Sequence, residues 1–320
     1  MRAFHIESAG AEPALCTLPD PEPGPGELRL RIGACGLNFA DLLMMTGDYQ
    51  DTPEAPFTLG MEVAGTVDAL GPGVDGPAIG TRVAVFAGQG GLAEMGCFPA
   101  ERAVPLPDAM SDIDAAAFQI AYGTSHVALA HTARLQPGET LLVLGAAGGV
   151  GLTAVEIGKV MGARVIACAR GATKLAVAER AGADHLIDAE TQDIREECKR
   201  LGGVDVVYDP VGGDQFEAAF RATNPEGRLL TIGFASGKMP QIKPNHLLVK
   251  NLSVMGLYWG GFLKFRPSVV TDSLATLMCW YEEGKIKPHV SHVLPLERVS
   301  EALDLLRARK STGKVVVTPR

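Results

Sequence analysis

Short runs of alternating apolar and polar residues fill the first hundred positions of the chain. Residues 28–32, 62–67 and 82–86 each place their apolar side chains on one face, which is the pattern of half-buried β-strands. Turns rich in glycine and proline, such as residues 71–73 and the stiff segment 19–26, separate these strands from one another and from the N-terminus. Several short strands joined by such turns predict a compact β-rich unit.

The pattern changes after residue 139, where short aliphatic runs alternate with amphipathic helical segments. Parallel strands need a long crossover connection, usually a helix, so this alternation predicts βαβ units and a parallel sheet covered by helices on both faces. The predicted strands are residues 140–144, 164–168, 185–187, 204–208, 228–232 and 252–257, and the helices between them include 150–161, 174–181 and 193–201.

Beyond residue 260 the pattern predicts two helices, residues 268–283 and 296–309, and an apolar final strand, residues 315–317. A last strand that follows two helices most simply rejoins the N-terminal β-rich unit. We therefore expect an α/β protein in which a Rossmann-type doubly wound parallel sheet is inserted into a discontinuous β-rich domain. The predicted bounds are residues 122–259 for the inserted domain and residues 1–121 with 260–320 for the β-rich domain.

Composition and charge narrow the class of protein. The 320 residues are 47% hydrophobic and 21% charged, which is typical of a folded chain of about two domains. The net charge of −8 argues against nucleic acid or an anionic membrane as the main partner. The six cysteines are scattered without zinc-ribbon spacing, which fits a reducing compartment. With no signal-peptide pattern and no membrane-length apolar run, we expect a cytoplasmic protein.

Three glycines mark the most specific local signal, at Gly145, Gly148 and Gly151, where a predicted strand ends and a helix begins. Glycines at this spacing allow a sharp turn, a close approach of the backbone to a pyrophosphate, and tight packing of the helix on the strand. The helix N-terminus then offers free N–H groups to the phosphates. The alternative is a glycine-rich tight turn that holds no ligand. The residues predicted to bind a dinucleotide here are Ala147, Gly148, Gly149 and Val150.

The end of the next strand bears on the choice of dinucleotide. A site for NAD places Asp or Glu there to bond the ribose 2′-hydroxyl. The segment 165–174 has no carboxylate, and it carries Arg170 and Lys174 one helical turn apart. Arginine binds phosphate in a bidentate manner and lysine adds a point charge, so the pair favours NADPH with its 2′-phosphate. The alternative is a pair of solvated cations at the start of a helix.

Several motifs spread along nearly the whole chain resemble one protein family. They are residues 35–41 (CGLNFAD), 59–65 (LGMEVAG), 135–139 (LQPGE) leading into 146–151 (AAGGVG), 182–184 (GAD), 206–213 (VVYDPVGG) and 313–317 (GKVVV). Together they resemble the zinc-free quinone oxidoreductase branch of the medium-chain dehydrogenase/reductase superfamily. The resemblance implies a GroES-like catalytic domain, NADPH as the cofactor and a homodimer, in which the exposed edge strand 252–257 would seek a partner.

Zinc alcohol dehydrogenases of the same superfamily bind a catalytic metal through a cysteine and through the histidine of a Gly-His-Glu motif. At the resembling positions this chain has Asn38 and Met61. A neutral amide and a thioether do not replace a thiolate and an imidazole as zinc ligands. Cys35 lies three residues before the matching position and is interpreted as a small buried residue. Only Cys97 is present where the family's structural zinc lobe carries four cysteines. We therefore predict that no metal is bound.

Without a Lewis acid, oxidation of an alcohol is disfavoured, whereas hydride transfer to a quinone or to an alkene conjugated with a carbonyl remains feasible. The resemblance offers Asn38, Asp41, Tyr49 and Thr124 as catalytic candidates. Asn38 would donate to the acceptor oxygen or pin the turn, and Tyr49 would donate a proton or cap a loop. Asp41 is interpreted as bonding backbone at a helix start. Thr124 is expected near the nicotinamide.

Two further segments complete the predicted site. Gly233, Phe234 and Ala235 resemble the segment whose backbone holds the nicotinamide carboxamide, although the glycine also fits a strand terminator. Trp259 is expected to line the acceptor pocket, with a dimer contact as the alternative. Two departures from some relatives bear on these expectations, namely Leu43 and Ala189 at positions where those relatives carry aromatic residues.

The leading interpretation is an NADPH-dependent, metal-independent quinone reductase. A rival enzyme class reduces the C=C bond of enones, enals or enoyl thioesters. A rival without turnover is an NADPH sensor or a structural protein of the crystallin type.

Overall fold

The computed structural model describes residues 1–8 and 10–319. The Cα positions divide the chain into two units, Met1–Ile120 with Pro288–Arg320, and Ala121–Lys287. The fold is mixed α/β, and its first unit is discontinuous in sequence, as predicted. The chain returns from the second unit to the first after Lys287, whereas the sequence analysis placed this return after residue 259.

Two sheets form the first unit. The larger has the strand order β15-β16-β3-β5-β6-β8, with β7 also paired to β3, and the smaller has the order β2-β1-β4. The strands of this unit are β1 (Arg2–Ile6), β2 (Ala14–Thr17), β3 (Glu27–Gly36), β4 (Phe57–Thr58), β5 (Glu62–Leu70), β6 (Arg82–Phe86), β7 (Met95–Pro99), β8 (Ala103–Pro105), β15 (Val290–Pro295) and β16 (Lys314–Thr318).

Strand β3 shows why the alternating pattern folds in this way. Leu28, Leu30 and Ile32 are buried in the core of the first unit, while the residues between them face the other side of the sheet. The last strand, β16, pairs antiparallel with β3 through Val316 opposite Gly36, so the prediction that it rejoins the N-terminal unit is confirmed. The helical segments of this unit are α1 (Phe39–Thr46), η1 (Ala100–Arg102), α2 (Asp112–Ala116), η3 (Leu296–Arg298) and α11 (Val299–Arg307).

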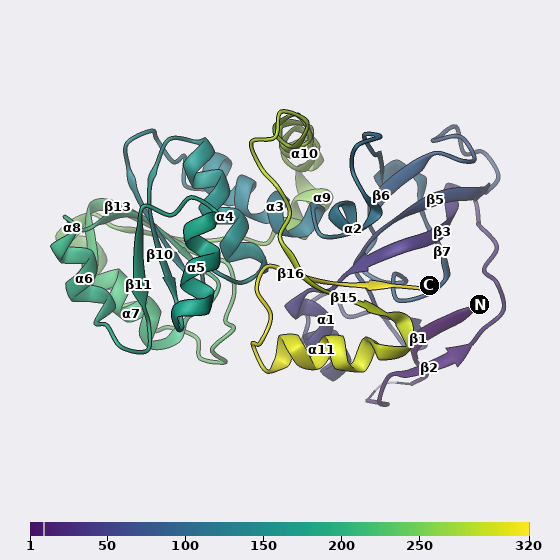
Figure 1. Cartoon of the computed structure of the whole chain (residues 1–320), viewed down its shortest axis with the longest axis horizontal. Coiled ribbons are helices and arrows are strands. Elements are labelled where there is room, and N and C mark those ends of the chain that lie inside the picture. Colours follow the sequence, from purple (N-terminus) through teal and green to yellow (C-terminus); the bar gives the residue numbers. More distant parts are fainter. Residues whose placement is uncertain (9, 320) are drawn as a thin grey trace. The chain divides into compact units, whose positions relative to one another are not determined.

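The second unit contains one parallel sheet with the order β11-β10-β9-β12-β13-β14. Helices α4 and α5 lie on one side of this sheet, and α6 and α7, which pack on each other, lie on the other (Figure 1). Its strands and the helices between them are β9 (Thr140–Leu144), α4 (Gly149–Val160), β10 (Arg164–Ala169), α5 (Ala172–Arg180), β11 (His185–Asp188), α6 (Ile194–Arg200), β12 (Val204–Asp209), α7 (Gly213–Ala222), β13 (Thr223–Thr231), α8 (Pro244–Lys250) and β14 (Ser253–Gly256).

Helix α3 (Gln119–His126) begins in the last residues of the first unit and continues into the second. The other helical segments described in the second unit are the π-helical turn η2 (Val127–Thr132), α9 (Trp259–Phe265) and α10 (Pro267–Glu282). Side-chain contacts between these helical segments explain why residues 260–287 belong to the second unit. The His126 ring lies 2.8 Å from the Ser273 hydroxyl and edge-on to the Trp280 ring, and His131 meets Phe262 in the same manner. The amphipathic pattern predicted helix α10, but the predicted domain bounds placed it with the β-rich unit, because the pattern does not show which unit a helix packs on.

Candidate nucleotide-binding and catalytic sites

The glycine turn joins β9 to helix α4. Gly145 has a φ of +59°, and a Cβ on Gly151 would lie 2.3 Å from the Gly145 carbonyl oxygen, so both positions need glycine for the backbone alone. Gly148 is different, because a Cβ there would meet only the Gly145 oxygen, at 3.3 Å. Gly148 is also the N-cap of α4, and no side chain caps this helix. The first N–H groups of α4 are therefore available to an anion.

The neighbouring loop follows strand β12, which pairs with β9 on the side away from β10. The buried Asp209 carboxylate accepts hydrogen bonds from the Val211 N–H at 2.7 Å and the Gly212 N–H at 2.9 Å, which orders this loop. A Cβ on Gly145 would lie 2.9 Å from Val211, so the two loops are in contact. They meet at the carboxyl edge of the sheet where the strand order reverses, and folds of this kind bind nucleotides at that point.

Gly233, Phe234 and Ala235 follow the end of β13 at the same edge of the sheet. The Ala235 N–H donates to the Pro210 carbonyl at 3.0 Å, which ties this segment to the loop after β12. Phe234 is 39% exposed. The structure therefore brings this predicted segment together with the glycine turn.

Arg170 and Lys174 lie at the carboxyl end of β10, the strand next to β9. Arg170 is exposed, and Lys174 is in the first turn of α5. Gly171 between them has a φ of +76°, and its N–H donates to the Asp188 carboxylate at 3.0 Å. The pKa of Asp188 is lowered, first of all by that N–H. Asp188, which the sequence analysis did not single out, thus holds the loop that presents Arg170.

Helix α3 carries Thr124, which is buried in the second unit. Its neighbour Gly123 lies against the Trp259 indole, since a Cβ there would come within 2.8 Å of the ring nitrogen. Trp259 thus contacts the residue that precedes Thr124 in α3, and the roles expected for Thr124 and Trp259 stay predictions. Trp259 is itself buried in the second unit.

Three buried hydroxyl groups beneath the glycine turn were not identified from the sequence. The Ser125 hydroxyl donates to the Val150 carbonyl at 2.8 Å and lies within 2.9 Å of the Thr153 and Tyr208 hydroxyls. Burial raises the pKa of Tyr208, so its hydroxyl stays protonated and able to donate. This group of hydroxyls fixes the first turn of α4. The sequence did not indicate the group, because a single polar residue within an apolar segment forms no recognisable pattern.

In the first unit, Asn38 is the N-cap of helix α1 and Asp41 is its third residue. The Asn38 N–H donates to the buried Asp41 carboxylate at 2.7 Å, which is the structural contact suggested for Asp41 by the sequence. Burial raises the pKa of Asp41 to about 7, against the opposing effects of that N–H and of the Lys314 ammonium. Tyr49 follows the end of α1 and packs half-buried on the core of this unit, and its proton-donor role stays a prediction.

The Asn38 amide is fully engaged within the protein. Its nitrogen donates to the Gly36 carbonyl at 3.2 Å and to the Glu62 carboxylate at 3.1 Å, and its oxygen accepts a hydrogen bond from Lys314 at 2.7 Å. Glu62 and Lys314 also form a buried ion pair. Because both amide hydrogens already have acceptors, the geometry favours the turn-pinning alternative for Asn38. The role of Glu62 and Lys314 was not identified from the sequence, although each is the ionisable first residue of an apolar strand.

The residues at the metal-ligand positions of related zinc enzymes are Asn38 and the buried Met61. Burial raises the pKa of Cys35 well above the usual thiol value, so this side chain remains a neutral thiol, and all six cysteines are free. Within residues 1–8 and 10–319, no three His, Cys, Asp or Glu side chains are grouped as metal ligands. Absence of a metal stays a prediction that a measurement must test.

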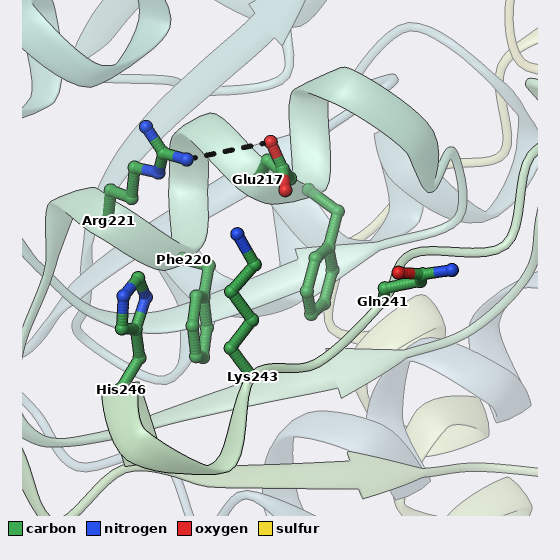
Figure 2. A pocket seen from close by; sticks show the side chains of 7 residues that line it. Glu217, Phe220, Arg221, Gln241, Lys243 and His246 are labelled. Atoms are coloured by element: carbon green, nitrogen blue, oxygen red, sulfur yellow. Dashed lines mark ion pairs between the residues drawn. The ribbon is translucent and has the colours of Figure 1, made fainter.

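A small pocket of about 10 Å³ opens between α7 and residues 241–246 of the second unit (Figure 2). The rings of Phe216, Phe220 and His246 stack along it, with centroids 5.9 and 5.8 Å apart. It contains none of the predicted site residues. Its volume is close to that of one water molecule, so it does not hold a nucleotide or a quinone.

Comparison with known proteins gives the family of this chain. Residues 24–108 match the family model described as alcohol dehydrogenase GroES-like domain, and residues 149–275 match the one described as zinc-binding dehydrogenase. The quinone oxidoreductase-like protein 2 homolog of Nematostella vectensis is 40% identical over 303 residues, which cover 93% of this chain and 83% of that relative. The chain belongs to the quinone oxidoreductase branch of the medium-chain dehydrogenase/reductase superfamily.

Solved structures of this branch share the whole fold. The quinone oxidoreductase of Thermus thermophilus, solved also with NADPH, aligns with a TM-score of 0.87 and 35% identity, covering 99% of this chain and 100% of that one. The Escherichia coli quinone oxidoreductase in complex with NADPH gives a TM-score of 0.91 and 29% identity, with 99% of each chain covered. This member of the branch is therefore an oxidoreductase with a GroES-like domain and a Rossmann-type sheet. Among the residues that the structure describes, no helix is long and apolar enough to cross a bilayer.

Proposed function

We propose that the protein is a metal-independent reductase that uses NADPH to reduce quinones. The observation that carries the proposal is the carboxyl edge of the second unit's sheet, where the uncapped start of α4 and the exposed Arg170 occur together. The first offers N–H groups to a pyrophosphate, and the second offers a guanidinium to a 2′-phosphate. The NADPH complexes of two relatives support the same choice of nucleotide.

The residues at the carboxyl edge of this sheet are of the types that bind NADPH. A Cβ at Gly148 would project into nearly open space beside the helix start, which leaves room for a pyrophosphate close to the backbone. When bound, NADPH supplies a hydride. Gly233, Phe234 and Ala235, held by the loop after β12, would position the nicotinamide end. Arg170 and Lys174 would bind the 2′-phosphate, and the first turn of α4 the pyrophosphate.

A quinone is a suitable acceptor for a protein that has Asn38 and Met61, rather than metal ligands, at the metal-binding positions of related zinc enzymes. The negative charge that develops on reduction is delocalised onto oxygen, so hydrogen-bond donors suffice to stabilise it. The hydroxyl groups of Tyr49 and Thr124 are the candidate donors. Relatives named as quinone oxidoreductases support this acceptor class.

The experiment is steady-state oxidation of NADPH with matched panels of p-quinones, 2-alkenals and an acryloyl thioester. We expect turnover with the quinones. Turnover with the alkenes alone would assign the protein to the C=C reductases. NADPH binding, seen as a change in its fluorescence, without turnover of any acceptor would contradict an enzyme and favour a sensor or a structural protein.

We also propose a homodimer. Strand β14 is the last strand of its sheet, and its outer edge would pair with the same edge of a second copy. Light scattering should give twice the mass of the chain, and a monomer mass at micromolar concentration would reject the dimer. The free cysteines support the expectation of a reducing, cytoplasmic compartment.

A further inference from the structure

Lys314 is the first residue of the last strand, β16, and its side chain is only 5% exposed. The pairing of β16 with β3, and a hydrogen bond from the Leu37 N–H to the Val315 carbonyl at 2.9 Å, place this strand beside the turn that follows β3. Asn38 lies in that turn, 276 residues earlier in the sequence. The fold thus brings a buried cation from the end of the chain to the N-cap of helix α1.

Lys314, Asn38 and Glu62 form a closed set of contacts. The ammonium donates to the Asn38 amide oxygen at 2.7 Å and to the Glu62 carboxylate at 2.5 Å, and the Asn38 amide nitrogen donates to the same carboxylate oxygen at 3.1 Å. The other Glu62 oxygen accepts the Ile120 N–H at 2.9 Å. Each charged group therefore has a partner of opposite charge and a neutral partner.

These contacts allow the Asn38 amide a single orientation. If the amide turned over, its N–H₂ group would face the Lys314 ammonium and its oxygen would face the Glu62 carboxylate, so two attractive contacts would become repulsive. The screening that water provides at a surface is weak here, because Glu62 is 1% exposed and Lys314 5%. The ion pair therefore fixes the amide, and the amide fixes the turn at residues 36–38 from which α1 starts.

We propose that Lys314 is a positioning residue for the reaction: by orienting the Asn38 amide it sets the start of helix α1, and with it the position of Tyr49, which follows the end of this helix. The inference rests on the proposed function, since it concerns turnover by that site. Lys314 acts through Asn38. Its loss therefore lowers the turnover number and leaves nucleotide binding, which depends on the second unit, unchanged.

Three variants separate positioning from mere stabilisation. Lys314→Met leaves the Glu62 charge buried without a partner, so both the melting temperature and kcat fall. Glu62→Gln leaves the Lys314 charge beside a neutral amide, with the same two effects. In the double variant Lys314→Met/Glu62→Gln neither member of the ion pair is left buried without its partner, and the melting temperature returns toward that of the wild type. The Asn38 amide still lacks its charged partners there, so kcat remains at least about tenfold lower.

A matched control is the ion pair between Arg29 and Asp68, 2.8 Å apart and each 18% exposed, which lies on β3 and the adjacent β5. The double variant Arg29→Met/Asp68→Asn should change kcat less than twofold. The Kd of NADPH should stay within about twofold of the wild-type value in all these variants.

Recovery of both the melting temperature and kcat in the Lys314→Met/Glu62→Gln variant would show that the ion pair is merely structural, and would overturn the inference. An unchanged kcat in the Lys314→Met variant would overturn it as well. If the wild type reduces no acceptor, the proposed function fails separately. The inference is then decided by hydrogen exchange of residues 36–46. Faster exchange confined to this segment in the double variant supports the orienting role, and unchanged exchange overturns it.

Discussion

Gly148→Ala tests whether the glycine turn holds a nucleotide or is only a tight turn. Gly148 has a φ of −80° and a ψ of 175°, which alanine adopts without strain, and its added Cβ would meet only the Gly145 oxygen, at 3.3 Å. Alanine is a poorer N-cap than glycine, so the free energy of unfolding should fall by about 1 kcal/mol or less. The fold is therefore expected to survive the substitution.

The added methyl group would project into the space that the pyrophosphate is expected to occupy. Placing a methyl group in a well-packed contact costs about 1–3 kcal/mol, which corresponds to roughly 5- to 150-fold weaker binding. NADPH and NADH share the pyrophosphate, so both should lose affinity by the same factor. Gly151→Ala is the matched comparison, because its Cβ would lie 2.3 Å from the Gly145 oxygen and so disrupts the turn itself.

The assay combines fluorescence titration of each nucleotide with thermal melting of each variant. We expect Gly148→Ala to melt near the wild-type temperature but to bind both nucleotides more weakly, and Gly151→Ala to melt at a clearly lower temperature. Wild-type affinity in a stable Gly148→Ala variant would refute the reasoning. The turn would then be a glycine-rich connection without a ligand.

Three further predictions concern cofactor choice, pH and metal. The double variant Arg170→Ala/Lys174→Ala should raise the Kd of NADPH at least about tenfold, as expected for lost charge-assisted contacts, and leave that of NADH unchanged; equal losses for both nucleotides would contradict the phosphate assignment. Burial lowers the pKa of His126 to about 4, so between pH 6.5 and 4 the unfolded chain binds more protons and stability falls as the pH falls, by up to about 3 kcal/mol. Denaturant titrations should show this loss and His126→Gln should reduce it; an unchanged pH dependence would exclude His126 as the cause. Elemental analysis should find less than one zinc per chain, and EDTA should leave turnover intact; loss of activity restored by zinc would overturn the metal-free prediction.

The sequence predicted the parallel sheet closely, because its strands are buried on both faces and therefore consist of continuous apolar runs. Residues 140–144 were predicted and form β9, and the prediction of 164–168 differs from β10 by one residue. The short strands β1, β2, β4, β7, β8 and β15 were not predicted. Strands of two to six residues carry too few alternating positions to give a clear pattern.

Part of the candidate site could also be found from the sequence. The need for glycine at Gly145 and Gly151 follows from backbone sterics, which act within a few residues. The N-cap and third residue of α1, Asn38 and Asp41, are likewise a local motif. Both were accessible because every atom that defines them lies close together along the chain.

The contacts that orient these local motifs were decided by the tertiary structure alone. Lys314 meets Glu62 across 252 residues, and a single charged residue at the start of an apolar strand carries no information about its partner. The assignment of α10 to the second unit likewise depends on Ser273 meeting His126 across 147 residues. Periodicity reports which face of an element is apolar, whereas the identity of the surface that covers this face depends on how the whole chain packs.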